Sequence, residues 1–116
     1  MARGERVVAR SQDLREGGEG VRFAIERGGR VLPAFVVRYG GAARAYVNAC
    51  AHQGVELDWL PGVFFDDEGL HLVCATHGAL FEPADGRCVA GPCRGAALVT
   101  LDVVERGGDV LLVEGE

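Results

Sequence analysis

The sequence lacks several features that would place it in a broad class at once. It contains no lysine, and charged residues interrupt every hydrophobic stretch of its 116 residues, so no apolar run reaches the length of a bilayer span. The N-terminal segment has no apolar core of the kind that a secretory signal requires. We therefore expect a cytoplasmic chain without a membrane span.

Positive charge is also missing from one long stretch of the chain. Residues 45–86 contain no arginine but seven acidic residues, whereas residues 1–44 contain nine arginines and five acidic residues. The net charge of −5 argues against a nucleic-acid partner, because nucleic-acid binding needs a basic surface. The acidic half is either an ordinary solvated surface or a docking face for a basic partner protein.

Length and composition indicate one folded domain. A chain of 116 residues can bury one hydrophobic core but not two. The hydrophobic share of 48% and the mean hydropathy of +0.12 are typical of a globular protein. No repeat and no linker interrupts the sequence, so we expect residues 1–116 to form a single domain.

The hydrophobic pattern predicts short β-strands and no helix. Val21, Phe23 and Ile25 alternate with more polar residues, which is the period of a half-buried strand. Glycine pairs at 28–29 and 40–41 are typical of hairpin turns. The sequence therefore predicts an all-β, antiparallel sandwich or partly open barrel. Its expected strands are 7–9, 21–26, 31–39, 44–48, 63–65, 70–73, 79–82, 87–90, 98–105 and 110–114.

Two compact pairs of cysteine and histidine stand out between these strands. Cys50 and His52 form a C-x-H motif, and Cys74 and His77 form a C-x-x-H motif after a gap of 21 residues. Thiolate and imidazole groups are good ligands for borderline and soft metals. With four Cys in a chain without a secretion signal, a metal site is favoured over a disulfide framework.

Three interpretations of these pairs remain open at this point. The four side chains could close a structural zinc site, hold a [2Fe–2S] cluster, or lie together by coincidence. Zinc sites mostly take their cysteines from one motif and their histidines from another. Here each motif supplies one cysteine and one histidine, which suits a two-metal cluster better.

The motifs and the residues that follow them resemble the Rieske [2Fe–2S] domain family. That family has C-x-H followed, after a gap of 15–25 residues, by C-x-x-H-G, and this chain has Gly78 directly after His77. Phe81, the pair Asp85-Gly86 and the pair Gly91-Pro92 follow in the family's order. The resemblance extends over roughly residues 20–114.

This resemblance implies a fold with a small cluster-binding subdomain and one Rieske-type [2Fe–2S] cofactor. Its cluster-binding loops would be residues 48–58 and 72–80, covered by a proline loop at residues 91–95. The implied ligands are Cys50 and Cys74 on the inner iron, and His52 and His77 on the outer iron. Gly54 and Gly78 would let the backbone approach the sulfides, and Pro92 would lie in the covering loop.

Four positions depart from the respiratory members of the family. Val55 and Thr76 stand where those proteins have the cysteines of a disulfide between the loops. Ala79 and Phe81 replace a serine and a tyrosine whose hydroxyl groups raise the reduction potential. We therefore expect a cluster without the disulfide, with a potential at the low end of the Rieske range, about −150 mV.

The function that the resemblance implies is electron transfer rather than catalysis. A Rieske ferredoxin passes single electrons from a reductase to a terminal oxygenase or a related redox enzyme. A complete oxygenase also needs a mononuclear iron with two histidine ligands, and the chain has three His, of which two are assigned to the cluster. The alternatives are a Rieske-like small subunit of a larger oxidoreductase, such as nitrite reductase, and a zinc-binding interaction module.

The remaining candidate residues are expected to be structural. Cys88 and Cys93 lie outside the ligand motifs and are interpreted as small core or turn residues. His71 precedes Cys74 in a predicted strand, and Trp59 is expected to pack in the segment between the two loops.

Overall fold

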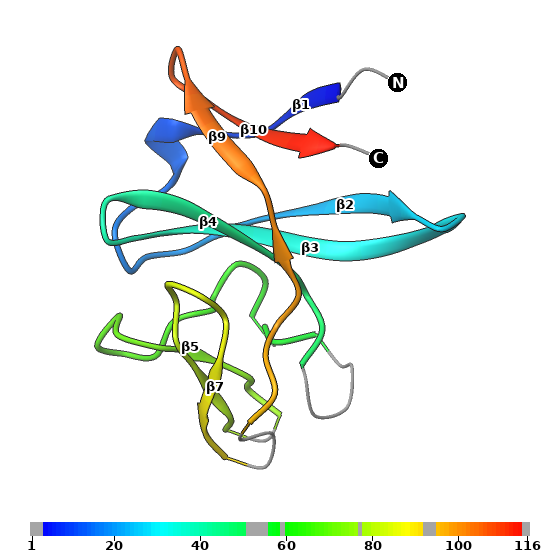
Figure 1. Ribbon diagram of the computed structural model, residues 1–116. Coiled ribbons are helices and arrows are strands. Elements are labelled where there is room, and N and C mark those ends of the chain that lie inside the picture. Colours follow the sequence, from blue (N-terminus) through cyan, green and yellow to red (C-terminus); the bar gives the residue numbers. More distant parts are fainter. Residues whose placement is uncertain (1–3, 51–55, 59, 77, 92–94, 115–116) are drawn as a thin grey trace.

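The strands of the computed structural model stack in three layers, each an antiparallel sheet (Figure 1). The structure describes residues 4–50, 56–58, 60–76, 78–91 and 95–114. This architecture confirms the predicted all-β fold, and the sheets do not close into a barrel. In chain order, the elements are β1 (Gly4–Arg10), the 3₁₀ helix η1 (Ser11–Asp13), β2 (Val21–Arg27), β3 (Arg30–Tyr39), β4 (Ala42–Val47), β5 (Leu72–Val73), β6 (Leu80–Phe81), β7 (Cys88–Ala90), β8 (Thr100–Leu101), β9 (Val103–Arg106) and β10 (Asp109–Glu114).

The first sheet joins the two terminal strands in the order β1-β10-β9. Gly4 pairs with Glu114, so the two ends of the described chain lie side by side at the top of Figure 1. The register shifts between Val7 and Ala9, which marks a bulge in β1. Among the described residues, no helix is long and apolar enough to cross a membrane.

The central sheet has the order β2-β3-β4-β8 and contains both predicted glycine hairpins. Arg27 pairs with Arg30 across Gly28-Gly29, and Tyr39 pairs with Ala42 across Gly40-Gly41. All four glycines have positive φ, between 60° and 77°, as a two-residue turn of type I′ requires. These two turns fix the register of β2, β3 and β4 in the central sheet.

Strand β3 is buried on both of its faces. Ala34 and Val36 pack into the core beneath the first sheet, whereas Phe35 and Val37 pack into a second core on the opposite side. This arrangement explains why the middle of β3 is a continuous apolar run rather than an alternating one. In the second core, the ring of Phe35 stacks on Phe64 with 3.9 Å between centroids.

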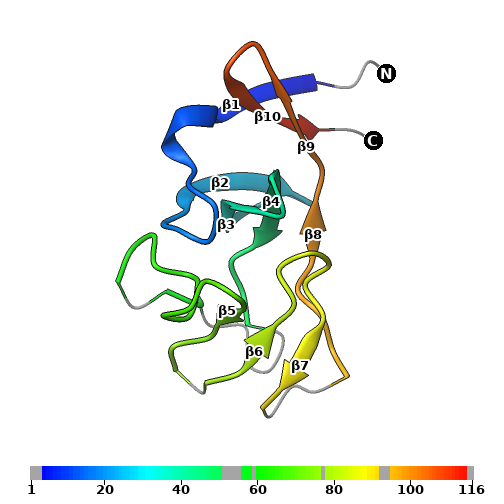
Figure 2. The same ribbon diagram turned by 90° about the vertical axis from the view of Figure 1, so that its left-hand side faces the viewer.

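The third layer is built from the long connection between β4 and β8, and its sheet has the order β5-β6-β7. Figures 1 and 2 both place it below the central sheet, on the side opposite to the first sheet. The Tyr46 hydroxyl of β4 donates a hydrogen bond of 2.7 Å to the carbonyl oxygen of Pro83. Burial raises the pKa of Tyr46 to about 12. Strand β4 therefore anchors the third layer directly.

Three local predictions were wrong. The predicted strand 98–105 is two strands in two different sheets, because the chain leaves the central sheet after Leu101 and joins the first sheet from Val103. Residues 63–65 do not form a strand, and only Phe65 makes an isolated bridge, to Leu72. The 3₁₀ helix at Ser11–Asp13 was not predicted, since three residues are too few to show a helical period.

One ion pair ties the first sheet to the central sheet. The guanidinium of Arg38 in β3 donates two hydrogen bonds, of 2.6 and 3.0 Å, to the carboxylate of Glu105 in β9. The same group also donates to the carbonyl oxygens of Leu14 and Ser11. Arg38, and secondarily the Ser11 side chain, lower the pKa of Glu105 to about 2.

We predict that Glu105→Gln destabilises the fold at neutral pH by about 1–2 kcal/mol. Because the pKa of Glu105 lies below its ordinary value of 4.5 in the folded chain, the ion pair contributes fully above pH 4.5. Its contribution is lost as the pH falls from there through about 2. Urea unfolding at neutral pH and at about pH 3 should show the difference between wild type and variant shrinking in acid.

The matched control is Glu26→Gln, which removes the same charge from an exposed position on β2. It should change the unfolding free energy little at either pH. A Glu105→Gln difference that stays constant between the two pH values would contradict the assigned ion pair.

Candidate metal centre

Two of the predicted ligands, Cys50 and Cys74, lie in the second core. Cys50 follows the end of β4, and Cys74 directly follows β5. Their exposed fractions are 2% and 0%, and both belong to the buried cluster that contains Phe35 and Phe64. The fold thus brings two thiols that are 24 positions apart in sequence into one apolar core.

The chain reverses tightly after Cys74. The amide of Gly78 donates to the carbonyl oxygen of Cys74 at 2.7 Å, and the amide of Cys74 donates to the carbonyl oxygen of Ala79 at 2.9 Å. Gly78 has a φ of 70°, which favours glycine at this turn. The second predicted cluster-binding loop is therefore a short turn closed by its own backbone.

A backbone hydrogen bond joins the two predicted cluster-binding loops. The amide of Ala75, next to Cys74, donates to the carbonyl oxygen of Leu57 at 3.0 Å. The side chain of Leu57 is fully buried in the same core as the two thiols. The end of the first loop is thereby held against the start of the second.

The predicted covering loop begins in direct contact with the second loop. Gly91 has a φ of 100°, and a Cβ atom at this position would lie 2.8 Å from the Cα atom of Ala79. Only glycine allows the two backbones to approach this closely. Pro92 of this loop lies outside the described residues.

The described residues fit the cluster that the sequence predicts. Two buried thiols on neighbouring loops supply the soft donors that an iron–sulfur centre needs. Ala79 and Phe81 are buried and carry no hydroxyl group. Within the described ranges, no group of three or more His, Cys, Asp or Glu side chains could hold a metal ion, so no competing site of that kind arises there. The predictions for His52, Gly54, Val55 and His77 fall outside these ranges.

The other residues that the sequence singled out occupy different environments. Cys88 is 3% exposed in β7, and its thiol lies 3.3 Å from the carbonyl oxygen of Ala90, which agrees with a structural role. His71 is partly exposed, with its Nδ1 3.7 Å from a carboxylate oxygen of Asp66. Trp59 and Cys93 lie outside the described residues.

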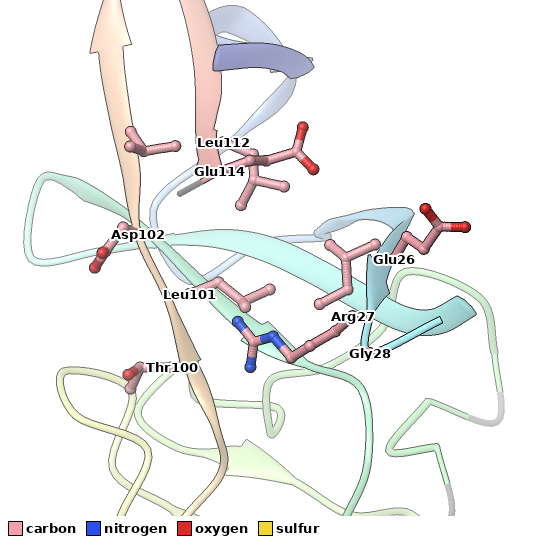
Figure 3. A pocket seen from close by; sticks show the side chains of 10 residues that line it. Glu26, Arg27, Gly28, Thr100, Leu101, Asp102, Leu112 and Glu114 are labelled. Carbon is pink, nitrogen blue, oxygen red and sulfur yellow. The ribbon is translucent and has the colours of Figure 1, made fainter. Parts of the chain in front are cut away.

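A groove between the first and central sheets is a separate feature of the molecule. Figure 3 shows the side chains that line it, with the guanidinium of Arg27 near the side chain of Leu101. Among the described residues, no histidine or cysteine lines this groove, and its charged lining residues are Glu26, Arg27, Asp102 and Glu114. It is therefore not part of the candidate metal centre.

Sequence reasoning missed the buried polar residues at the ends of the first loop. Asn48 is fully buried, and its side chain bonds both to the backbone of Leu57 and to the carboxylate of Asp58. The available signal was the position of Asn48, a polar residue two places before Cys50 at the end of an apolar strand. Its partners nine and ten residues later could not be inferred from a local pattern.

Three antiparallel layers with two buried thiols on adjoining loops fit an iron–sulfur protein of the all-β class. The chain belongs to the Rieske [2Fe–2S] domain family, whose model matches residues 4–105. The family's cofactor is a Rieske [2Fe–2S] cluster, which confirms the predicted family and cofactor. The assignment of individual ligands stays a prediction. No curated protein sequence matches the chain significantly.

Solved structures show the same fold. The ferredoxin of carbazole 1,9a-dioxygenase from Nocardioides aromaticivorans IC177 is 28% identical, with a TM-score of 0.70, and the match covers 97% of this chain and 98% of that one. The terminal oxygenase of the same system is 25% identical, with a TM-score of 0.74, and the chain spans 30% of its length and 97% of its own. A ferredoxin of Sphingomonas yanoikuyae B1, 22% identical over 97% of this chain and 100% of that one, shares the fold with a TM-score of 0.72.

We predict that Gly91→Ala displaces the covering loop from the second loop. The added Cβ would meet a backbone atom of Ala79 that cannot move without shifting the turn after Cys74. We expect a loss of about 1–3 kcal/mol in stability and faster bleaching of the iron–sulfur absorption. Thermal unfolding and visible absorption in the presence of a chelator measure both effects.

Gly95→Ala is the matched control, because Gly95 has a similar φ of 97° but, among the described residues other than its chain neighbours, no atom within 4 Å of an added Cβ. The control variant adds the same backbone strain as Gly91→Ala but not the steric contact with Ala79. Equal bleaching rates in the two variants would show that the contact with Ala79 does not protect the centre.

Proposed function

We propose that the protein is a one-electron carrier, a Rieske ferredoxin that passes electrons from a reductase to a terminal oxygenase or a related redox enzyme. The observation that carries this proposal is the correspondence with the carbazole-dioxygenase ferredoxin along 97% of this chain and 98% of that chain. The bound cluster would supply a centre that takes up and releases single electrons. The chain's own part is to hold the centre, exclude water from it and present it to partners.

The proposed ligands are Cys50, His52, Cys74 and His77. Support comes from the motif spacing and from the burial of both cysteines in one core, with their loops joined by the bond between Ala75 and Leu57. The core beside the thiols is formed by aromatic and aliphatic side chains, which exclude water from the inner side of the site.

We further propose that a partner protein docks through a basic face. The related ferredoxin belongs to a dioxygenase system, and solved structures of carbazole 1,9a-dioxygenase include a complex of its oxygenase with its ferredoxin. Residues 45–86 of this chain contain no arginine or lysine, and of their acidic residues Asp67, Glu68 and Asp85 are exposed in the third layer. An acidic surface on the third layer would attract a basic partner and speed association at low salt.

We predict a midpoint potential at the low end of the Rieske range, about −150 mV. Ala79 and Phe81 cannot donate the hydrogen bonds that stabilise the reduced state in high-potential members of the family, and the surrounding sequence is acidic. Potentiometric titration followed by EPR of the reduced protein measures this value. A midpoint above zero would contradict the argument from the missing hydroxyl groups.

We also predict that Cys50→Ala and Cys74→Ala abolish the cluster, whereas Cys88→Ala retains it. The first two variants remove proposed thiolate ligands, and the third removes an equally buried thiol from β7 of the same core. Iron and acid-labile sulfide analysis, with the EPR signal of the reduced protein, distinguishes the variants. Wild-type protein that binds zinc and no sulfide after anaerobic iron loading would overturn the proposed function.

A further inference from the structure

Two polar residues are buried at the ends of the first cluster-binding loop. Asn48 is 0% exposed, and the side chain of Asp58 is also 0% exposed. Burying an amide and a carboxylate is unfavourable unless hydrogen bonds replace the lost water. In the described part of the chain, every buried side-chain nitrogen and oxygen has a partner, so this pair is fully accommodated.

Asn48 closes the loop on itself. Its Oδ1 accepts a hydrogen bond of 2.8 Å from the amide of Leu57, and its Nδ2 donates one of 3.0 Å to Oδ1 of Asp58. Its own backbone amide donates to the carbonyl oxygen of Pro33 in β3 at 2.8 Å. The side chain of Asn48 therefore holds both ends of the loop together, and its backbone amide ties them to the central sheet.

Asp58 connects this closure to a charge on the outer strand. Its Oδ2 accepts a hydrogen bond of 2.9 Å from the amide of Gly62 and lies 3.4 Å from Nε of Arg22 in β2. Arg22 is 41% exposed and also contacts Glu56 at 2.7 Å. The buried carboxylate is thus compensated by two neutral donors and by one cation at the surface.

The same closure reaches the second loop through one peptide group. Leu57, whose amide is held by Asn48, accepts the hydrogen bond from Ala75, next to Cys74. Asn48 itself lies two residues before Cys50. A shift of the closure would therefore be transmitted to the chain at both proposed cysteine ligands.

We infer that Asn48, Asp58 and Arg22 form a positioning unit that fixes the two cluster-binding loops relative to each other and sets the midpoint potential of the cluster. The inference rests on the proposed function and assigns none of the three as a ligand. Reduction adds a negative charge to the cluster, so the buried carboxylate of Asp58 disfavours the reduced state and the nearby guanidinium of Arg22 favours it.

An exchange of the two buried side chains tests the unit. Asn48→Asp alone sets two carboxylates against each other, and Asp58→Asn alone sets two amide groups against each other or against the Gly62 amide. The double variant Asn48→Asp/Asp58→Asn again pairs one amide with one carboxylate and can satisfy the Leu57 and Gly62 amides. Its net charge equals that of the wild type.

We expect each single variant to lose its cluster to a chelator about tenfold faster than the wild type, with a shifted midpoint and altered EPR line shape. The double variant should recover most of the retention, the midpoint and the line shape. Single variants with wild-type retention, midpoint and line shape would overturn the inference. So would a double variant that performs no better than the worse single one.

A second test uses the variant Arg22→Gln, which changes a partly exposed side chain and leaves the buried residues Asn48 and Asp58 unchanged. It should lower the midpoint, because Asp58 loses its nearest cation. The matched control is Arg27→Gln, which removes the same charge from an exposed position on the same strand and should shift the midpoint less. Equal midpoints for the two variants would overturn the inference even where the loop variants fail to fold.

The wild-type measurements distinguish a failure of the proposed function from a failure of the positioning role. Wild-type protein without iron and sulfide overturns the proposed function and this inference together. A wild type with a normal cluster, whose retention and potential do not respond to these substitutions, overturns only the positioning role of Asn48, Asp58 and Arg22.

Discussion

The burial of both faces of β3 is the constraint on which the other layers depend. One face carries Ala34 and Val36 and requires the first sheet as a cover, whereas the other carries Phe35 and Val37 and requires the third layer. Apolar area that is not covered on either side would remain in contact with water, at roughly 25 cal/mol per Å². The two outer layers therefore cover different faces of β3. The first sheet completes a sandwich with the central sheet, and the third layer encloses the thiols of Cys50 and Cys74.

The parts of the fold that could be predicted are those whose cause is local in sequence. Gly28-Gly29 and Gly40-Gly41 predicted their hairpins correctly, because a two-residue turn needs residues that adopt positive φ. The break of the predicted strand 98–105 at Asp102 could not be predicted in this way. Its cause is that the chain passes from the partner β4, which is distant in sequence, to the partner β10, which follows β9 across a two-residue turn.

The candidate site also has features that the sequence could predict and features that it could not. Ligand types and their spacing are short-range features, so Cys50 and Cys74 could be chosen from the sequence, and the structure places both in one core. The hydrogen bond from Ala75 to Leu57 and the closure of the first loop by Asn48 depend on which side chains meet across a loop. A hydrophobic period cannot predict these contacts, since they are hydrogen bonds between residues nine or more positions apart.

The polar closure of the first loop and the apolar lining of the second complement each other. At the second loop, Ala79 and Phe81 are buried without a hydroxyl group, so their side chains offer no hydrogen bond to a sulfur atom. At the first loop, the buried carboxylate of Asp58 adds negative charge, and the guanidinium of Arg22 lies 3.4 Å from it. Both features disfavour an additional electron at the centre. The low potential that we predict would therefore require no unusual ligand in this chain.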